Sequence, residues 1–141
     1  MLWNRSIPRA TVIPVLAYAN ANDAAAWLCE AFAFTVRLRV DTHRVQLNVG
    51  EGAVIVREPR PYETGAPLGL GHSITVRVEN ADAHCSQARE HGARITQEPC
   101  THPYGERQYT AEDPAGHSWT FSQSVADMPP EDWGGSTVNL Q

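Results

Sequence analysis

Apolar and polar positions follow the same plan in two successive stretches of the chain. In the first stretch, the apolar run at 12–18 predicts a strand, and capping side chains at 20–23 open a helix. Apolar residues recur along this helix at helical spacing, from Ala24 and Leu28 to Phe32, and give it one buried face. Three further runs, at 34–40, 44–49 and 53–58, have the composition and spacing of strands.

The second stretch repeats this order after a proline- and glycine-containing segment at 59–71, which predicts a linker. Strands are expected at 73–78, 94–97, 108–111 and 118–121, with a capped helix from 80 to about 91. A shift of 60 residues aligns Asn20 with Asn80 and Ala21 with Ala81. We therefore predict an α+β fold of two tandem βαβββ units in one domain at 1–123, with repeats at about 10–58 and 72–123.

The tail at 124–141 is rich in proline and glycine and is expected to lie outside the sheets. The tail contains Trp133, a large apolar side chain that is stabilised by burial. We expect it to dock on its own domain or on a partner subunit, where it could close a pocket.

Charge and composition narrow the class of protein. The 141 residues carry 16 acidic and 11 basic side chains, a net charge of −5, which disfavours nucleic-acid binding. The chain lacks any apolar run that approaches the roughly 20 residues of a membrane span. The three cysteines have no CxxC spacing, and no signal peptide is evident, so they are expected to be free thiols in the cytoplasm. We expect no nucleic-acid or membrane partner.

The segment from His102 to Phe121 predicts a loop, a strand, a tight turn and a second strand. Its turn, Asp113-Pro114-Ala115-Gly116, has the residue types of a type I turn. The pattern P-aromatic-G-x-R-x-aromatic followed by D-P-x-G resembles the last hairpin of the glyoxalase/bleomycin-resistance/dioxygenase superfamily, which has the vicinal oxygen chelate fold. The resemblance covers about residues 10–123 and implies curled mixed sheets with helices on their outer face. It also implies a pocket that is often completed across a two-fold axis, so a homodimer is expected.

In enzymes of this superfamily, four strands each supply one metal ligand, a His, Glu or Gln. The register of Val78-Glu79-Asn80 places one of these positions at Ser73, and the 60-residue shift places another at Ile13. Matching Gly52 with Gly116 places the remaining two at Val56 and Thr120. None of these four side chains is a competent ligand for a divalent metal, so we expect no metal or other cofactor. His72 lies one position from Ser73 and would enter the site only if the strand were bulged.

Strand alternation then adds Thr75 and Arg77 to a mixed apolar and hydroxylic pocket, while Trp119 and Phe121 face the helices. Tyr104 could stack on a planar ligand from the mouth of the pocket. Arg107 either contacts the ligand or pairs with a carboxylate such as Asp113 or Glu106. The predicted ligand-binding residues are Tyr104, Arg107, Arg77, Thr75, Ser73, Thr120, Val56 and Ile13.

These features favour a metal-free protein of the bleomycin-resistance type, which sequesters a planar or amphipathic small molecule and has no catalytic residue. One alternative is a metal-dependent lyase, isomerase or dioxygenase on the same scaffold, if the register is different. Another is acid–base chemistry through Glu58. The third is a regulatory module with Tyr104 and Trp133 at a protein contact.

Overall fold

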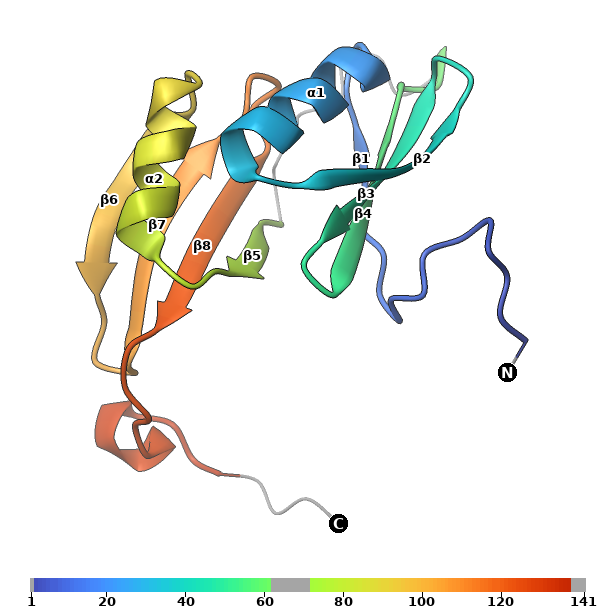
Figure 1. Cartoon of the computed structure of the whole chain (residues 1–141). Helices are drawn as coiled ribbons and strands as arrows, with labels where there is room; N and C mark the ends of the chain where they lie inside the picture. The colour runs from blue at the N-terminus through green and yellow to red at the C-terminus, as the bar shows by residue number, and fades with distance from the viewer. Residues whose placement is uncertain (1, 62–71, 138–141) are drawn as a thin grey trace.

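The computed structural model describes residues 2–61 and 72–137 (Figure 1). The first repeat consists of β1 (Val15–Ala17), α1 (Ala21–Phe32), β2 (Thr35–Val40), β3 (Arg44–Val49) and β4 (Gly52–Arg57). The second consists of β5 (Ile74–Arg77), α2 (Ala81–Glu90), β6 (Arg94–Thr101), β7 (Glu106–Glu112) and β8 (Ser118–Ser124). The prediction of two tandem βαβββ units is confirmed.

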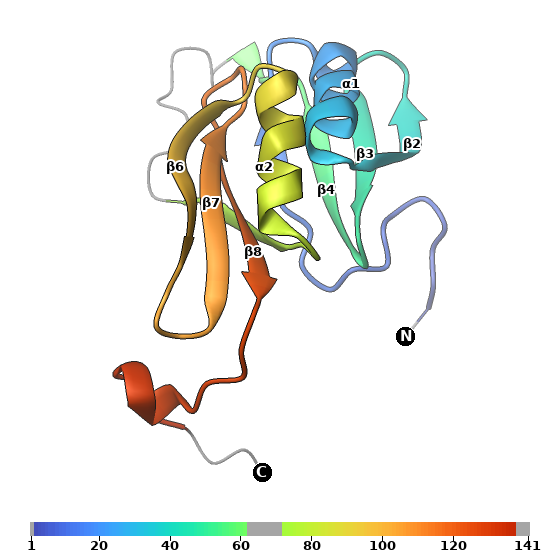
Figure 2. The same cartoon turned by 60° about the vertical axis from the view of Figure 1, so that its left-hand side comes forward.

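Each repeat forms its own four-stranded mixed sheet. The strand orders are β1-β4-β3-β2 and β5-β8-β7-β6, so the two repeats have the same topology. In each sheet the first and last strands of the repeat pair in parallel, and the remaining pairs are antiparallel. The helices α1 and α2 lie side by side, and each covers one face of its own sheet (Figure 2).

Both helices begin with the same pair of contacts. The side chains of Asn20 and Asn80 cap the first turns of α1 and α2, at 2.9 and 3.0 Å from backbone N–H groups. In addition, the backbone N–H of Ala21 donates to Glu58 Oε2, and that of Ala81 donates to Gln123 Oε1. Glu58, the residue considered for acid–base chemistry, thus contacts the start of α1 from the end of its sheet.

One aromatic core joins the two repeats. Phe32 at the end of α1 lies 5.7 Å from Trp119 and 4.7 Å from Phe121, measured between ring centroids. All three side chains are buried, and Trp119 and Phe121 face the helices, as predicted. Ile74, Val76 and Val78, in β5 and just after it, are half-buried against this core. Because residues of both repeats fill this core, we expect the repeats to fold as one unit.

The tail leaves the second sheet and forms a short 3₁₀ helix at Pro130–Trp133 (Figure 1). The ring of Trp133 lies 5.4 Å from that of Tyr104, so the tail does contact its own domain. Most of the predicted linker, at 62–71, lies outside the described residues. Among the helices in the described ranges, none has the length and apolar character needed to cross a membrane.

Candidate functional site

The face of the second sheet turned away from the helices is lined by polar side chains. Thr75 is the cross-strand partner of Thr120, which is in turn the partner of Thr110. Because side chains alternate along a strand, these residues lie opposite the buried Trp119 and Phe121. We call this surface the polar face, and it consists of Thr75, Arg77, Gln108, Thr110, Thr120 and Ser122.

Hydrogen bonds tie the polar face together and connect it to the loop between β6 and β7. The Thr110 and Thr120 hydroxyls lie 2.9 Å apart, and Gln108 Nε2 donates to Ser122 Oγ at 3.0 Å. The Tyr104 hydroxyl donates to Gln108 Oε1 at 3.1 Å. Tyr104 is therefore fixed at the end of the polar face by its hydroxyl, where its ring could contact a ligand.

An acidic and a basic group lie beside this network. Ser122 Oγ donates to Glu106 Oε1 at 2.6 Å. Hydrogen bonds from Ser122 and Ser124 lower the pKa of Glu106, and the positive charge of Arg77 lowers it further. Glu106 is therefore ionised at neutral pH, and Arg77 supplies a cation on the exposed part of the face.

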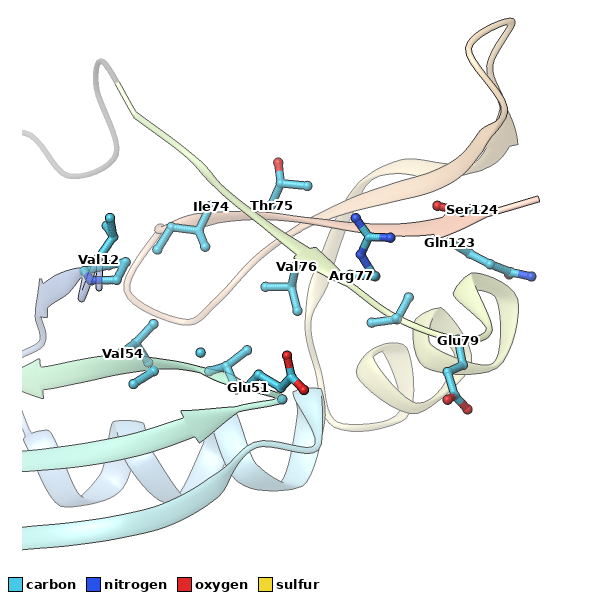
Figure 3. Close-up of a pocket in the computed structure, with 16 residues that line it drawn as sticks. Val12, Glu51, Val54, Ile74, Thr75, Val76, Arg77, Glu79, Gln123 and Ser124 are labelled. Carbon is cyan, nitrogen blue, oxygen red and sulfur yellow. The ribbon is translucent and has the colours of Figure 1, made fainter. Parts of the chain in front are cut away.

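A cavity of about 820 Å³ adjoins the polar face, between β5 and the end of the β3–β4 hairpin. Figure 3 shows Ile74 and Val76 on the side of β5 that faces Val54, whereas Thr75 and Arg77 point the opposite way. The walls of the cavity are largely apolar, and Glu51 is at its edge. A volume in this range is large enough for a small organic molecule.

The structure brings together four of the predicted ligand-binding residues. Ser73 precedes β5 and is exposed, and Thr75, Arg77 and Thr120 belong to the polar face. Ile13, half-buried, lies in the other repeat just before β1. These placements follow the predicted strand alternation, while the ligand contacts themselves stay predictions.

The predicted orientation of Val56 is wrong. Val56 is fully buried in the core, where it is the partner of Leu16, and Ile55 takes the outward position beside Val15. The same shift places Val54 in the core. The cause is turn length: the turn between β3 and β4 has two residues, whereas that between β7 and β8 has five. Aligning Gly52 with Gly116 therefore shifts the predicted register of β4 by one residue, which exchanges its inward and outward faces.

Arg107 is also placed differently from expectation. It lies on the helix side of β7, where its Nε and Nη2 both donate to the Asp82 carboxylate at 3.0 Å. We predicted that Arg107 contacts the ligand or pairs with Asp113 or Glu106. Instead, it forms this bidentate pair with Asp82 in the first turn of α2. The Arg107 hydrogen bond lowers the pKa of Asp82.

The side chains at the superfamily's metal positions do not fit a divalent metal. Ile13, Ser73 and Thr120 offer no nitrogen, sulfur or carboxylate ligand, and neither Val56 nor its outward neighbour Ile55 changes this. Within 2–61 and 72–137, no group of three or more His, Cys, Asp and Glu side chains is placed to hold a metal ion. His72 is exposed, with its ring 6.4 Å from that of His117.

Sequence reasoning missed a buried carboxylate at the β7–β8 turn. Asp113 accepts hydrogen bonds from the Tyr18 hydroxyl, from Trp119 Nε1 and from the backbone N–H groups of Ala115 and His117. Burial and the negative charge of Asp113 raise the pKa of Tyr18. The turn motif predicted the position of Asp113, but nothing local to it indicated a partner in the first repeat.

Comparison with known proteins agrees with this architecture. The family model described as Glyoxalase/Bleomycin resistance protein/Dioxygenase superfamily matches residues 10–121. The chain belongs to this superfamily. No curated protein matched it.

Several solved structures are similar. TioX from Micromonospora sp. ML1 is 30% identical, with a TM-score of 0.66, over 81% of this chain and 98% of that one. A glyoxalase/bleomycin resistance protein/dioxygenase family enzyme from Burkholderia phytofirmans PsJN is 15% identical, with a TM-score of 0.70, over 80% and 97%. Lactoylglutathione lyase from Agrobacterium tumefaciens is 16% identical, with a TM-score of 0.64, over 84% and 96%. The last two likenesses concern the fold alone.

Proposed function

We propose that the protein binds and sequesters a small planar or amphipathic molecule without a metal, at the polar face and the adjoining cavity. The observation that carries this proposal is the set of side chains at the superfamily's ligand positions, where hydroxylic Ser73 and Thr120 are combined with apolar Ile13. Sequestration requires no nucleophile or general base, because affinity alone removes the molecule from solution. Hydroxyl groups orient an organic ligand, and apolar walls supply most of the buried area.

We further propose that a second copy of the chain completes the site. Thr75 and Arg77 are exposed, and small-molecule sites commonly enclose 70–90% of their ligand. One open sheet face provides a single wall, so the facing wall would come from the partner of a homodimer.

Binding of 8-anilinonaphthalene-1-sulfonate, a planar amphipathic anion, tests the proposal. We expect saturable fluorescence enhancement that Arg77→Ala weakens about tenfold, the effect of one lost charge-assisted contact. Arg39→Ala, which removes an exposed arginine from β2, is the matched control and should bind as the wild type does. Equal affinities of the wild type and Arg77→Ala would contradict the proposed site.

Thermal unfolding of EDTA-treated protein tests the absence of a metal. We expect no saturable rise in Tm with Zn²⁺, Ni²⁺, Fe²⁺ or Mn²⁺. A concentration-dependent rise with one of them would follow from linkage and would favour a metalloenzyme instead.

A further inference from the structure

A thiol and an imidazole lie together at the end of β6. Cys100 Sγ is 3.5 Å from Nε2 of His102, which follows the strand. Gln97 Nε2 donates to the same sulfur at 3.1 Å. Cys100 is half-buried, and its sulfur has two fixed neighbours. A nucleophile and a base within hydrogen-bond reach are the arrangement that activates a side chain for attack.

The imidazole is held in place on its other side. The His102 ring stacks on Tyr104, with centroids 5.0 Å apart and planes inclined by 2°. The loop carrying them is anchored at Gly105, whose carbonyl accepts from the N–H groups of Val125 and Ala126. Gly105 has a φ of +86°, and a Cβ there would lie 2.3 Å from the Ala126 carbonyl oxygen. Only glycine fits this position, so the loop holds His102 close to the thiol.

The ion pair of Arg107 with Asp82 lies close to Cys100. Arg107 Nη1 donates to the Oγ1 of Thr101, the residue next to Cys100, at 3.1 Å. The pKa of Arg107 is raised, chiefly by its hydrogen bond to Asp82. An imidazole within hydrogen-bond reach of a thiol can accept its proton when the sulfur attacks.

The other two cysteines have different surroundings and provide internal controls. Burial raises the pKa of the Cys29 thiol and of the Cys85 thiol. Cys85 is buried, with Arg89 Nη2 at 3.7 Å from its sulfur. Neither cysteine has an imidazole among its described contacts, so both should react slowly in the folded protein.

We propose that Cys100 is a modification site, with His102 as its base, for low-molecular-weight disulfides. The thiol proton moves to His102 Nε2, and the thiolate attacks one sulfur of the disulfide. A new S–S bond joins that sulfur to Cys100 while the original S–S bond breaks. The second sulfur leaves as a thiolate and takes the proton from the imidazolium, so atoms and electrons balance without a further oxidant. This proposal does not depend on the binding of a ligand at the polar face.

Reaction of the folded protein with 5,5′-dithiobis(2-nitrobenzoate), an aromatic disulfide, tests it. We expect one fast equivalent of released thiolate that Cys100→Ser abolishes and that Cys29→Ser and Cys85→Ser retain. Mass spectrometry of the trapped adduct should place it on Cys100. Persistence of the fast equivalent in Cys100→Ser would overturn the proposal.

The role of His102 is tested by the pH–rate profile between pH 6 and 9. We expect His102→Asn to slow the fast reaction about fivefold at pH 6.5 and to move the profile to higher pH, because the base is lost. His43→Asn, which changes an exposed histidine between β2 and β3, is the matched control and should retain the wild-type profile. His102→Gln gives a second measurement if the Asn variant is poorly folded. Unchanged profiles in both folded variants would overturn the assignment of His102 as the base.

Discussion

The two repeats share one topology but differ in what covers the outward face of their sheets. In the first repeat, Gln46 and its cross-strand partner Ile55 are 3% and 2% exposed on this face. The N-terminal segment is bonded there: Gln46 Nε2 donates to the Ser6 carbonyl at 2.9 Å. In the second repeat the matching pair, Thr110 and Thr120, is half-buried, and Thr75 and Arg77 are exposed at the edge of this face.

The outward faces of the two sheets, which share one topology, therefore have different surroundings. Arg37 adds a second bond to the N-terminal segment, from its Nη2 to the Arg5 carbonyl at 2.9 Å. The first sheet therefore uses its outward face for packing within the chain. In the second sheet, Thr75 and Arg77 of the polar face are exposed in the described part of the chain, so we place the candidate site in this repeat.

Removal of the aromatic contact between the repeats should have the largest effect. Phe32→Ala deletes a buried ring that touches Trp119 and Phe121, and we expect a loss of about 3–5 kcal/mol in the free energy of unfolding. Urea unfolding followed by tryptophan fluorescence and by circular dichroism should give one shared transition. Val36→Ala, at an exposed position of β2, should cost little. Separate transitions for the two probes would show that the repeats unfold independently.

Local patterns predicted the repeats, whereas contacts between elements needed the structure. The caps at Asn20 and Asn80 and most strand centres follow from residue type and spacing over a few positions. The length of the turn between β3 and β4 decides whether Val56 faces the core or the outward side of the sheet. Residue composition alone does not fix that length. His84, a polar residue of the predicted helix at 80–91, is half-buried between the repeats. Its partners come from distant parts of the chain, so no local signal could identify them.

Asp113→Asn should have the next largest effect, because Asp113 links the β7–β8 turn to Tyr18 in the first repeat. The Asn side chain has one acceptor oxygen where Asp113 has two. A buried donor, such as the Tyr18 hydroxyl or Trp119 Nε1, is therefore left without an acceptor. We expect a loss of about 2–3 kcal/mol in the free energy of unfolding. Asp127→Asn, at an exposed position, is the control. A loss no larger than that of the control would mean that the four hydrogen bonds contribute little net stability.

Gln46→Ala tests the covering of the first sheet directly. It removes the hydrogen bond to Ser6, and we expect a loss of about 1 kcal/mol with faster amide hydrogen exchange in the N-terminal segment. Asn48→Ala removes a side-chain bond to Thr35 from the same strand and should leave exchange in that segment unchanged. Equal exchange in both variants would show that Gln46 does not hold the segment on the sheet.

His84 forms a contact that the first repeat lacks, because the 60-residue shift aligns His84 with Ala24. The pH dependence of the free energy of unfolding tests this contact. His84 Nε2–H donates to the Phe32 carbonyl at 3.0 Å, so Nδ1 accepts from the Tyr109 hydroxyl. Burial lowers the pKa of His84 below its ordinary value of 6.5. Below about pH 6.5 the unfolded chain therefore binds a proton before the folded chain does.

We expect the contribution of His84 to be complete above this pH and to be lost as the pH falls through the lowered pKa. Its slope cannot exceed about 1.4 kcal/mol per pH unit, the limit for one proton. Urea unfolding between pH 5 and 8 should show a smaller acid loss in His84→Ala than in the wild type. His91→Ala, which changes an exposed histidine one residue beyond α2, should behave like the wild type. If the free energy of unfolding has the same pH dependence in His84→Ala and in the wild type, protonation of His84 does not weaken the packing between the repeats.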